Sequence, residues 1–198
     1  MLLYDSPVSG NCYKVRLLLA HLGLGYERHH VDVVDRSWRR ELLGEINPAL
    51  RVPTLILDDG RPLAESNAIL MYLGEGTGYV PADRYDRARV LQWLFFEQYS
   101  HEPYIAVVRF WMAFSPDPPT EDEIDARRSG GYAALKAMER HLDGRPFLVG
   151  DGYTVADIAL YAYTHVAHEG GFDLAAYPSV RAWLDRVREQ PGHVPMNA

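Results

Sequence analysis

Apolar residues recur along this chain with two different periods, and the change from one period to the other divides the sequence in two. In the first part, short β-branched and apolar runs alternate with segments of helical periodicity, in the order β-α-β-α-β-β-α. In the second part, strand patterns nearly vanish and apolar positions follow helical spacing. We therefore expect an α/β domain over residues 1–76 and an all-helical domain over residues 86–198, joined by a linker.

The first part predicts a mixed sheet with helices on both faces. The expected strands are residues 2–4, 26–33, 54–57 and 61–64, and the first two expected helices are residues 12–22 and 38–43. Asp59-Gly60 between the last two strands is a strong hairpin signal. Ser66 is the expected N-cap of the third helix, with its hydroxyl accepting from backbone amides. This order of elements is typical of the thioredoxin-like fold.

The second part predicts two long helices, over residues 86–114 and 121–142, separated by a segment that contains three prolines. Thr154 and Asp157 form a capping-box pattern at the start of a further helix. We assign these two residues to folding rather than to catalysis. A last helix begins near Pro178 and carries apolar residues at helical spacing.

Charge and composition exclude several classes of protein. The chain of 198 residues has a net charge of -7 and no stripe of basic residues that would neutralise phosphates, which argues against nucleic acid as a partner. It begins without a basic segment, and no apolar run approaches the roughly 18 residues of a membrane helix. A single cysteine, Cys12, excludes an internal disulfide framework. We expect a cytoplasmic protein without a membrane partner.

Metal and nucleotide chemistry find no support in the sequence. The eight histidines are scattered, and His29 and His30 would point to opposite faces of a strand. No glycine-rich phosphate loop is present. We therefore expect no metal and no bound cofactor.

Two features between residues 47 and 73 suggest a binding site. If the Val52–Pro53 bond is cis, the backbone N–H and C=O of Val52 face outward and can pair with an extended peptide. Glu65 and Ser66 stand at a helix N-terminus, where backbone amides favour an anion and a carboxylate can receive an ammonium group. Together these features describe a cradle for a small zwitterionic peptide.

These motifs, together with the loop SGNCYK at residues 9–14, resemble the cytosolic glutathione transferase family. The family pattern is a cis-proline after valine, a hairpin, and a Glu-Ser or Gln-Ser pair that caps the third helix. The resemblance extends across nearly the whole chain. It implies that glutathione is the co-substrate and that the protein is a homodimer acting in detoxification.

The resemblance places the thiol-activating group in the loop at residues 9–14. Ser9 matches the serine of the serine-type classes, and Asn11 matches the asparagine of the bacterial nu-type proteins. A hydroxyl or amide that donates to the sulfur favours the thiolate, which is the nucleophile. Ser9 is alternatively a helix cap only, and Ser6 is a third candidate hydroxyl. Cys12 is expected to be a small residue of the helix.

The resemblance also assigns the glutathione contacts. Val52, which precedes Pro53, would pair with the cysteinyl backbone, and Glu65 and Ser66 would hold the γ-glutamyl ammonium and carboxylate. The glycyl carboxylate needs a cation, and the candidates are Arg39, Arg40 and Arg51. A contribution from Asn67 stays open.

The second substrate would lie against the long helix of the helical domain. The residues that we expect there are polar and aromatic, and they are His101, Glu102, Tyr104 and Trp111. Aromatic residues at helical spacing are alternatively part of the core, and His101 with Glu102 is alternatively a solvated turn before Pro103.

We expect conjugation of the glutathione thiolate to a small hydrophobic electrophile. One alternative is a glutathione-dependent disulfide reductase, which the Ser-x-Asn-x-x-Lys spacing motivates. The other is a non-catalytic module that keeps the fold for binding or assembly. A model disulfide and a halogenated arene separate the two reactions, and a glutathione-dependent rise in melting temperature separates both from a module without the ligand site.

Overall fold

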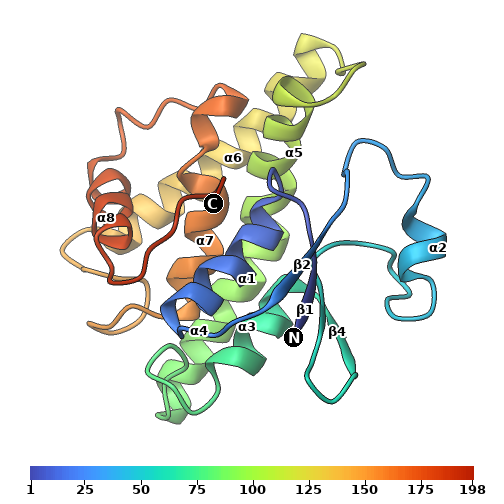
Figure 1. Ribbon diagram of the computed structural model, residues 1–198. Helices are drawn as coiled ribbons and strands as arrows, with labels where there is room; N and C mark the ends of the chain where they lie inside the picture. The colour runs from blue at the N-terminus through green and yellow to red at the C-terminus, as the bar shows by residue number, and fades with distance from the viewer. The chain divides into compact units, whose positions relative to one another are not determined.

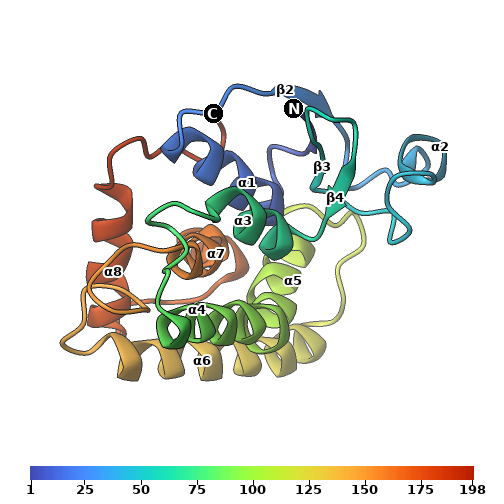
Figure 2. The ribbon, with the colours of Figure 1, turned by 90° about the horizontal axis from the view of Figure 1, so that it is seen from below.

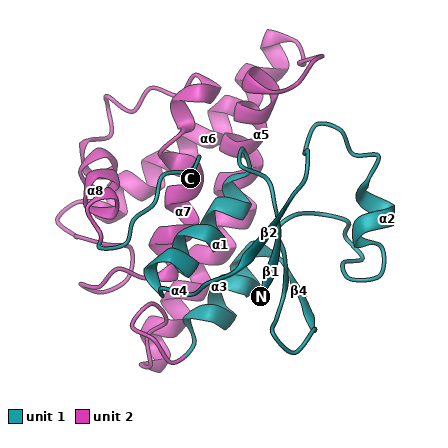
Figure 3. Cartoon of the chain, viewed as in Figure 1, with its two compact units in different colours: residues 1–75, 191–198 teal, residues 76–190 magenta.

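The computed structural model describes residues 1–198. The chain forms two compact units, which Figure 3 shows in different colours. Unit 1 comprises residues 1–75 and 191–198, and unit 2 comprises residues 76–190.

Unit 1 is the predicted thioredoxin-like domain, built on a four-stranded mixed sheet. Its elements are β1 (Leu2–Asp5), α1 (Gly10–His21), β2 (Glu27–His30), α2 (Arg39–Leu43), β3 (Thr54–Ile56), β4 (Pro62–Ala64) and α3 (Ser66–Gly74). The strand order is β2-β1-β3-β4. β1 pairs with β2 in parallel and with β3 in antiparallel register, and β3 and β4 form the predicted hairpin.

Two helices cover one face of this sheet. In Figures 1 and 2, α1 and α3 lie side by side on that face, whereas the short helix α2 stands apart from the strands on the other side. The core beneath α1 and α3 consists of fully buried apolar side chains, which are Leu3, Val15, Leu19, Leu55 and Ile69. Their burial positions the N-terminal ends of both helices, because each helix is held by its apolar face.

The segment at residues 191–198 is bound to α1 and β2. The hydroxyl of Tyr13 donates to the backbone oxygen of Val194 at 2.7 Å, and Arg28 donates to the backbone oxygen of Ala198 at 2.8 Å. Arg16 is 2% exposed and donates to the side chain of Asp5 and to the backbone oxygen of Met196. These contacts satisfy a buried guanidinium that the apolar core could not solvate.

Unit 2 consists of helices. Its elements are α4 (Arg84–Phe96), the π-helical segment η1 (Glu97–His101), α5 (Glu102–Ala113), α6 (Glu121–Leu142), α7 (Val155–Thr164), the 3₁₀ segment η2 (Ala167–Gly170) and α8 (Pro178–Arg188). Every residue of α7 is buried, so this helix forms the centre of the unit. No helix of the protein is both long and apolar enough to cross a membrane.

The capping box at the start of α7 is confirmed. Asp157 accepts from the backbone N–H and the hydroxyl of Thr154, at 3.0 and 3.1 Å. Its other oxygen accepts from the backbone of Leu148 at 3.0 Å and from the indole of Trp183 at 2.9 Å. The carboxylate therefore joins three segments of unit 2, and the structural role assigned to it is correct.

Three local predictions need correction. The helix expected over residues 86–114 contains a π-helical segment where the chain shifts from one hydrogen-bond register to another. The second strand spans Glu27–His30 rather than residues 26–33, because β1 offers only four partners. Glu65, and not Ser66, occupies the N-cap of α3, and Ser66 is its first helical residue.

Candidate functional site

Ser9 stands at the N-cap of α1. Its backbone is extended (φ -83°, ψ 118°), and its Oγ accepts from the backbone N–H of Cys12 at 3.3 Å. This contact uses the hydroxyl as an acceptor, and the hydroxyl hydrogen remains a possible donor. The N-cap role and donation to an anion at the start of α1 are therefore compatible.

Asn11, in the first turn of α1, is linked to the start of α3. The hydroxyl of Ser66 donates to Oδ1 of Asn11 at 3.1 Å. Nζ of Lys14 donates to the same oxygen at 2.8 Å and lies 3.4 Å from Oγ of Ser66 and 3.5 Å from Oδ1 of Asn67. The loop expected to activate a thiol and the residues expected to hold a γ-glutamyl group thus share one hydrogen-bond network.

Glu65 and Ser66 differ in their exposure. Ser66 is 4% exposed, whereas Glu65 is exposed and carries a positive φ of 68°. A non-glycine residue at such a φ costs roughly 1–3 kcal/mol and is typical of ligand sites. The Glu65 side chain makes no capping hydrogen bond to α3. Its carboxylate is therefore available to an ammonium group.

The Val52–Pro53 bond is cis, which is the condition set by the sequence argument. The loop before it is held by Asn47, which is 2% exposed. The amide of Asn47 donates to the backbone oxygen of Arg51 at 2.8 Å and to the hydroxyl of Thr54 at 2.9 Å. Asn47 is a positioning residue that sequence analysis missed, and its place directly before Pro48 was the available signal.

The candidate arginines are not equivalent. Burial, followed by the charges of Arg36 and Arg51, lowers the pKa of Arg39 below its usual value. Nε of Arg39 is buried without a hydrogen-bond partner. Arg40 is exposed and does not contribute to this cluster. The group of like charges would accept a carboxylate, and Arg36 is a member that sequence analysis did not name for this role.

The alternatives for the reactive group are constrained by burial. Cys12 is fully buried, and this burial raises the pKa of its thiol from 9.0 to about 12. The thiol is therefore protonated near neutral pH and is a poor nucleophile. Ser6 is 2% exposed, and its backbone oxygen accepts from Ser9 and Arg16.

The residues expected at the second-substrate site lie in different surroundings within unit 2. His101 is fully buried, and its Nε2 lies 2.8 Å from the hydroxyl of Thr164. Trp111 packs against the core, with the guanidinium of Arg127 5.2 Å from its ring centre. Glu102 is partly exposed and accepts from Gln98 at 2.8 Å. His101 is therefore part of the interior rather than of a solvated turn.

Tyr104 lines a hollow of about 280 Å³ between η1, α5 and α6. The other walls are Phe96, Tyr99, Ser100, Gly130, Ala133 and Ala134. A Cβ atom at Gly130 would stand 2.3 Å from the Tyr104 ring, so glycine is required for this close approach. None of the other three expected residues lines the hollow.

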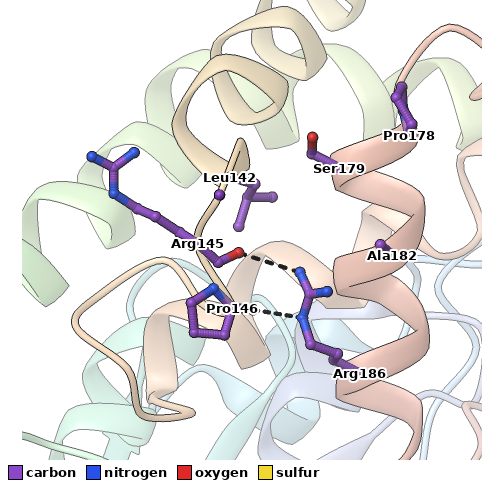
Figure 4. Close-up of a pocket in the computed structure, with 8 residues that line it drawn as sticks. Leu142, Arg145, Pro146, Pro178, Ser179, Ala182 and Arg186 are labelled. Atoms are coloured by element: carbon purple, nitrogen blue, oxygen red, sulfur yellow. Dashed lines mark hydrogen bonds between the residues drawn. The ribbon is translucent and has the colours of Figure 1, made fainter.

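A second pocket in unit 2, of about 450 Å³, lies between α8 and the turn after α6 (Figure 4). Arg186 donates from Nε to the backbone oxygen of Pro146 at 2.9 Å and from Nη2 to that of Arg145 at 3.3 Å. This arginine therefore fastens the turn to the helix. No residue from the predicted site lines this pocket, and no group of acidic, histidine or cysteine side chains is placed to hold a metal ion.

Comparison with known proteins agrees with the fold. Residues 3–78 match the model of the glutathione S-transferase N-terminal domain, and residues 101–191 match that of the C-terminal domain. A solved glutathione S-transferase from Pseudomonas fluorescens is 49% identical, with a TM-score of 0.94 over 100% of this chain and 98% of the other. The chain belongs to the glutathione S-transferase family.

Two further relatives bear on the chemistry. The disulfide-bond oxidoreductase YfcG of Escherichia coli is 30% identical, over 96% of this chain and 90% of that protein. The structure of yeast Ure2p in complex with S-hexylglutathione is 25% identical, with a TM-score of 0.85 over 96% of this chain and 95% of the other. The chain is thus similar to proteins named for different reactions, a transferase and a disulfide-bond oxidoreductase.

Proposed function

We propose that this protein binds glutathione through unit 1 and stabilises its thiolate for attack on a small hydrophobic electrophile. The observation that carries the proposal is the 3.1 Å hydrogen bond between Ser66 and Asn11. It joins the loop at the start of α1 to the start of α3. Two parts of the sequence with separate expected roles toward one ligand are therefore in direct contact, which supports a single binding site.

The two ends of glutathione would meet opposite charges. The exposed carboxylate of Glu65 would receive the γ-glutamyl ammonium, and the backbone amides that begin α3 at Ser66 would receive its carboxylate. The glycyl carboxylate would bind at Arg39 and Arg51, where the guanidinium groups repel one another until an anion arrives. The cysteinyl backbone would pair with Val52, which precedes Pro53.

The reaction would begin with ionisation of the bound thiol. The Ser9 hydroxyl and the Asn11 amide would donate to the sulfur and lower the pKa of the thiol, aided by the N-terminus of α1. The thiolate would attack the electrophilic carbon, forming a C–S bond. The bond from that carbon to its leaving group would break, and the leaving group would depart with the electron pair.

A second candidate reaction is reduction of a disulfide, which the Escherichia coli relative favours by its name. One glutathione thiolate would attack the disulfide, form a mixed disulfide and release one substrate thiolate. A second glutathione would attack the glutathione sulfur of this intermediate, yielding oxidised glutathione and the second substrate thiolate. The buried Cys12 takes no part in this scheme.

For the second substrate, we propose the partly exposed residues of the expected set. These are Glu102, Tyr104 and Trp111. The fully buried His101, which is hydrogen-bonded to Thr164, would act indirectly rather than by touching the substrate. A Tyr104→Ala variant that changes the Michaelis constant for the electrophile, but not for glutathione, would support this assignment.

We also propose that the protein is a homodimer that associates through α4 and η1. Leu91, Phe95 and Tyr99 are spaced four residues apart and are 36%, 71% and 84% exposed. An isologous contact between two copies would cover this apolar row on both subunits. Gel filtration should give twice the 22.5 kDa of the chain, and Phe95→Glu should give a single chain.

Three assays test the proposed function. Glutathione should raise the melting temperature, as a ligand bound only by the native state must. Turnover is then compared with a halogenated arene and with a model disulfide, each with glutathione. Conjugation of the arene supports the first reaction, and formation of oxidised glutathione from the disulfide supports the second. A melting temperature that glutathione leaves unchanged would contradict both and favour the non-catalytic module.

A further inference from the structure

Lys14 lies at the centre of the proposed glutathione site, although it is fully buried. Lysine is among the residues least often found in protein interiors, because its ammonium group is strongly hydrated. The only other lysine of the sequence, Lys136, is exposed on α6. A charged group on the buried side of α1, beside Val15 and Leu18, is costly unless its hydrogen bonds compensate for the lost hydration.

The contacts of Lys14 determine how Asn11 is turned. An ammonium group only donates hydrogen bonds, so the atom of Asn11 at 2.8 Å from Nζ must be the carbonyl oxygen. The hydroxyl of Ser66 donates to the same oxygen. The amide nitrogen of Asn11 therefore lies on the opposite side of the carboxamide. The usual ambiguity in the orientation of an asparagine side chain is removed by these two donors.

The same ammonium group reaches the start of α3. Nζ lies 3.4 Å from Oγ of Ser66 and 3.5 Å from Oδ1 of Asn67. Lys14 thus contacts residues expected at the thiol and residues expected at the γ-glutamyl group. A change at either end of the network is transmitted to the other through shared hydrogen bonds.

We propose that Lys14 is a positioning residue for thiol activation. It holds the Asn11 amide toward the sulfur of bound glutathione, and its positive charge favours the thiolate over the thiol. This inference rests on the proposed function, because Asn11 acts on a thiol only if glutathione binds at this loop. Beyond that function, Lys14 is the residue that sets the orientation of the Asn11 amide.

The variants separate positioning from a structural role. Lys14→Met keeps the length and apolar stem but removes the charge and the donors, whereas Lys14→Arg keeps both. Lys14→Gln is a second neutral variant, whose amide can satisfy the buried acceptors if the methionine variant does not fold. Lys136→Met is the matched control, because it makes the same chemical change at an exposed position.

Each folded variant is measured for glutathione affinity by calorimetry, for the pKa of the bound thiol by ultraviolet titration, and for its pH–rate profile. We expect the neutral variants to bind glutathione within about tenfold of wild type. At neutral pH they should turn over about 10- to 100-fold more slowly, with profiles displaced to higher pH. Lys14→Arg should recover most of the rate, and Lys136→Met should match wild type.

Two results would count against a positioning role for Lys14. A neutral variant with a lower melting temperature but an unchanged thiol pKa and pH profile would overturn the inference and leave Lys14 as a structural link. In that case wild-type binding and thiol ionisation would still support the proposed function. If wild type does not bind glutathione, the proposed function fails and the inference fails with it.

Discussion

The hydroxyl of Ser66 donates a hydrogen bond to Oδ1 of Asn11 at 3.1 Å, although the two residues are 55 positions apart in the sequence. Ser66 begins α3 and Asn11 belongs to the first turn of α1. The two helices pack together on one face of the sheet, so their N-terminal ends converge. A zwitterionic ligand with a thiol between its ends matches this convergence.

The link between Ser66 and Asn11 predicts non-additive effects on glutathione binding. Ser66→Ala and Asn11→Ala should each weaken binding, and the double variant should be affected less than the sum of the two. The expected coupling is about 0.5–3 kcal/mol, because both changes break the same hydrogen bond. Isothermal calorimetry on the four proteins of the cycle measures it. Additivity within about 0.3 kcal/mol would show that the contact is energetically unimportant.

Ser9 and Asn11 predict different results in an ultraviolet titration of bound glutathione. If Ser9 activates the thiol, Ser9→Ala should raise the pKa of the bound thiol toward its free value. If Asn11 is the main donor, Asn11→Ala should do so and Ser9→Ala should not. Ser9→Gly is a useful comparison, because it removes the hydroxyl but destabilises the helix N-cap much less than alanine does.

Arg39 should determine recognition of the glycyl carboxylate. Arg39→Gln should weaken glutathione binding by about 10- to 100-fold, since hydrogen bonds to a charged group contribute about 1.5–3 kcal/mol. Binding of γ-glutamylcysteine, which lacks the glycyl residue, should change little. Arg40→Gln is the comparison at an exposed position of the same helix. A larger loss in the Arg40 variant would move the assignment to that residue.

Cys12 should be unreactive in the native protein. Its thiol pKa is raised from 9.0 to about 12, so at a given neutral pH it contains about 10³-fold less thiolate than an ordinary cysteine. Labelling with iodoacetamide should be slow in buffer and fast in guanidinium chloride. Rapid labelling of the native protein would show that the helix opens or that burial does not control this thiol.

Asp157 should make stability depend on pH in an unusual direction. Burial raises the pKa of its carboxyl from 3.8 to about 6 in the folded state. Its contribution to the free energy of unfolding is therefore complete below pH 3.8 and is lost as the pH rises through about 6. The stability advantage of wild type over Asp157→Asn should narrow across this range by up to about 3 kcal/mol.

This pH dependence is tested by urea unfolding of wild type and of Asp157→Asn between pH 4 and pH 7. At pH 7 the asparagine variant should still be less stable, by about 1–3 kcal/mol, because its single amide oxygen cannot accept from all the donors that Leu148, Thr154 and Trp183 direct at the two carboxylate oxygens. Asp151→Asn, at an exposed position of the preceding loop, should stay within about 0.5 kcal/mol of wild type. If the difference in free energy of unfolding between wild type and Asp157→Asn stays constant across the pH range, the raised pKa of Asp157 is contradicted.

Part of the fold, and the cap role of one candidate site residue, could be predicted from local pattern. The N-cap role of Ser9, the hairpin at Asp59-Gly60 and the capping box of Asp157 follow from side chains that act on backbone within three residues. The N-cap of α3 was misplaced by one residue, because a positive φ at Glu65 depends on tertiary contacts rather than on propensity.

The amino-acid sequence by itself determined the order of strands and helices, the thioredoxin-like arrangement and the motifs of the glutathione S-transferase family. These depend on periodicity and on neighbouring residues. Only the tertiary structure decided that Lys14, Asn11 and Ser66 form one network, that Arg39 lies among like charges and that His101 is buried. Such relationships depend on how elements distant in sequence pack, and local pattern contains no information about the distances between them.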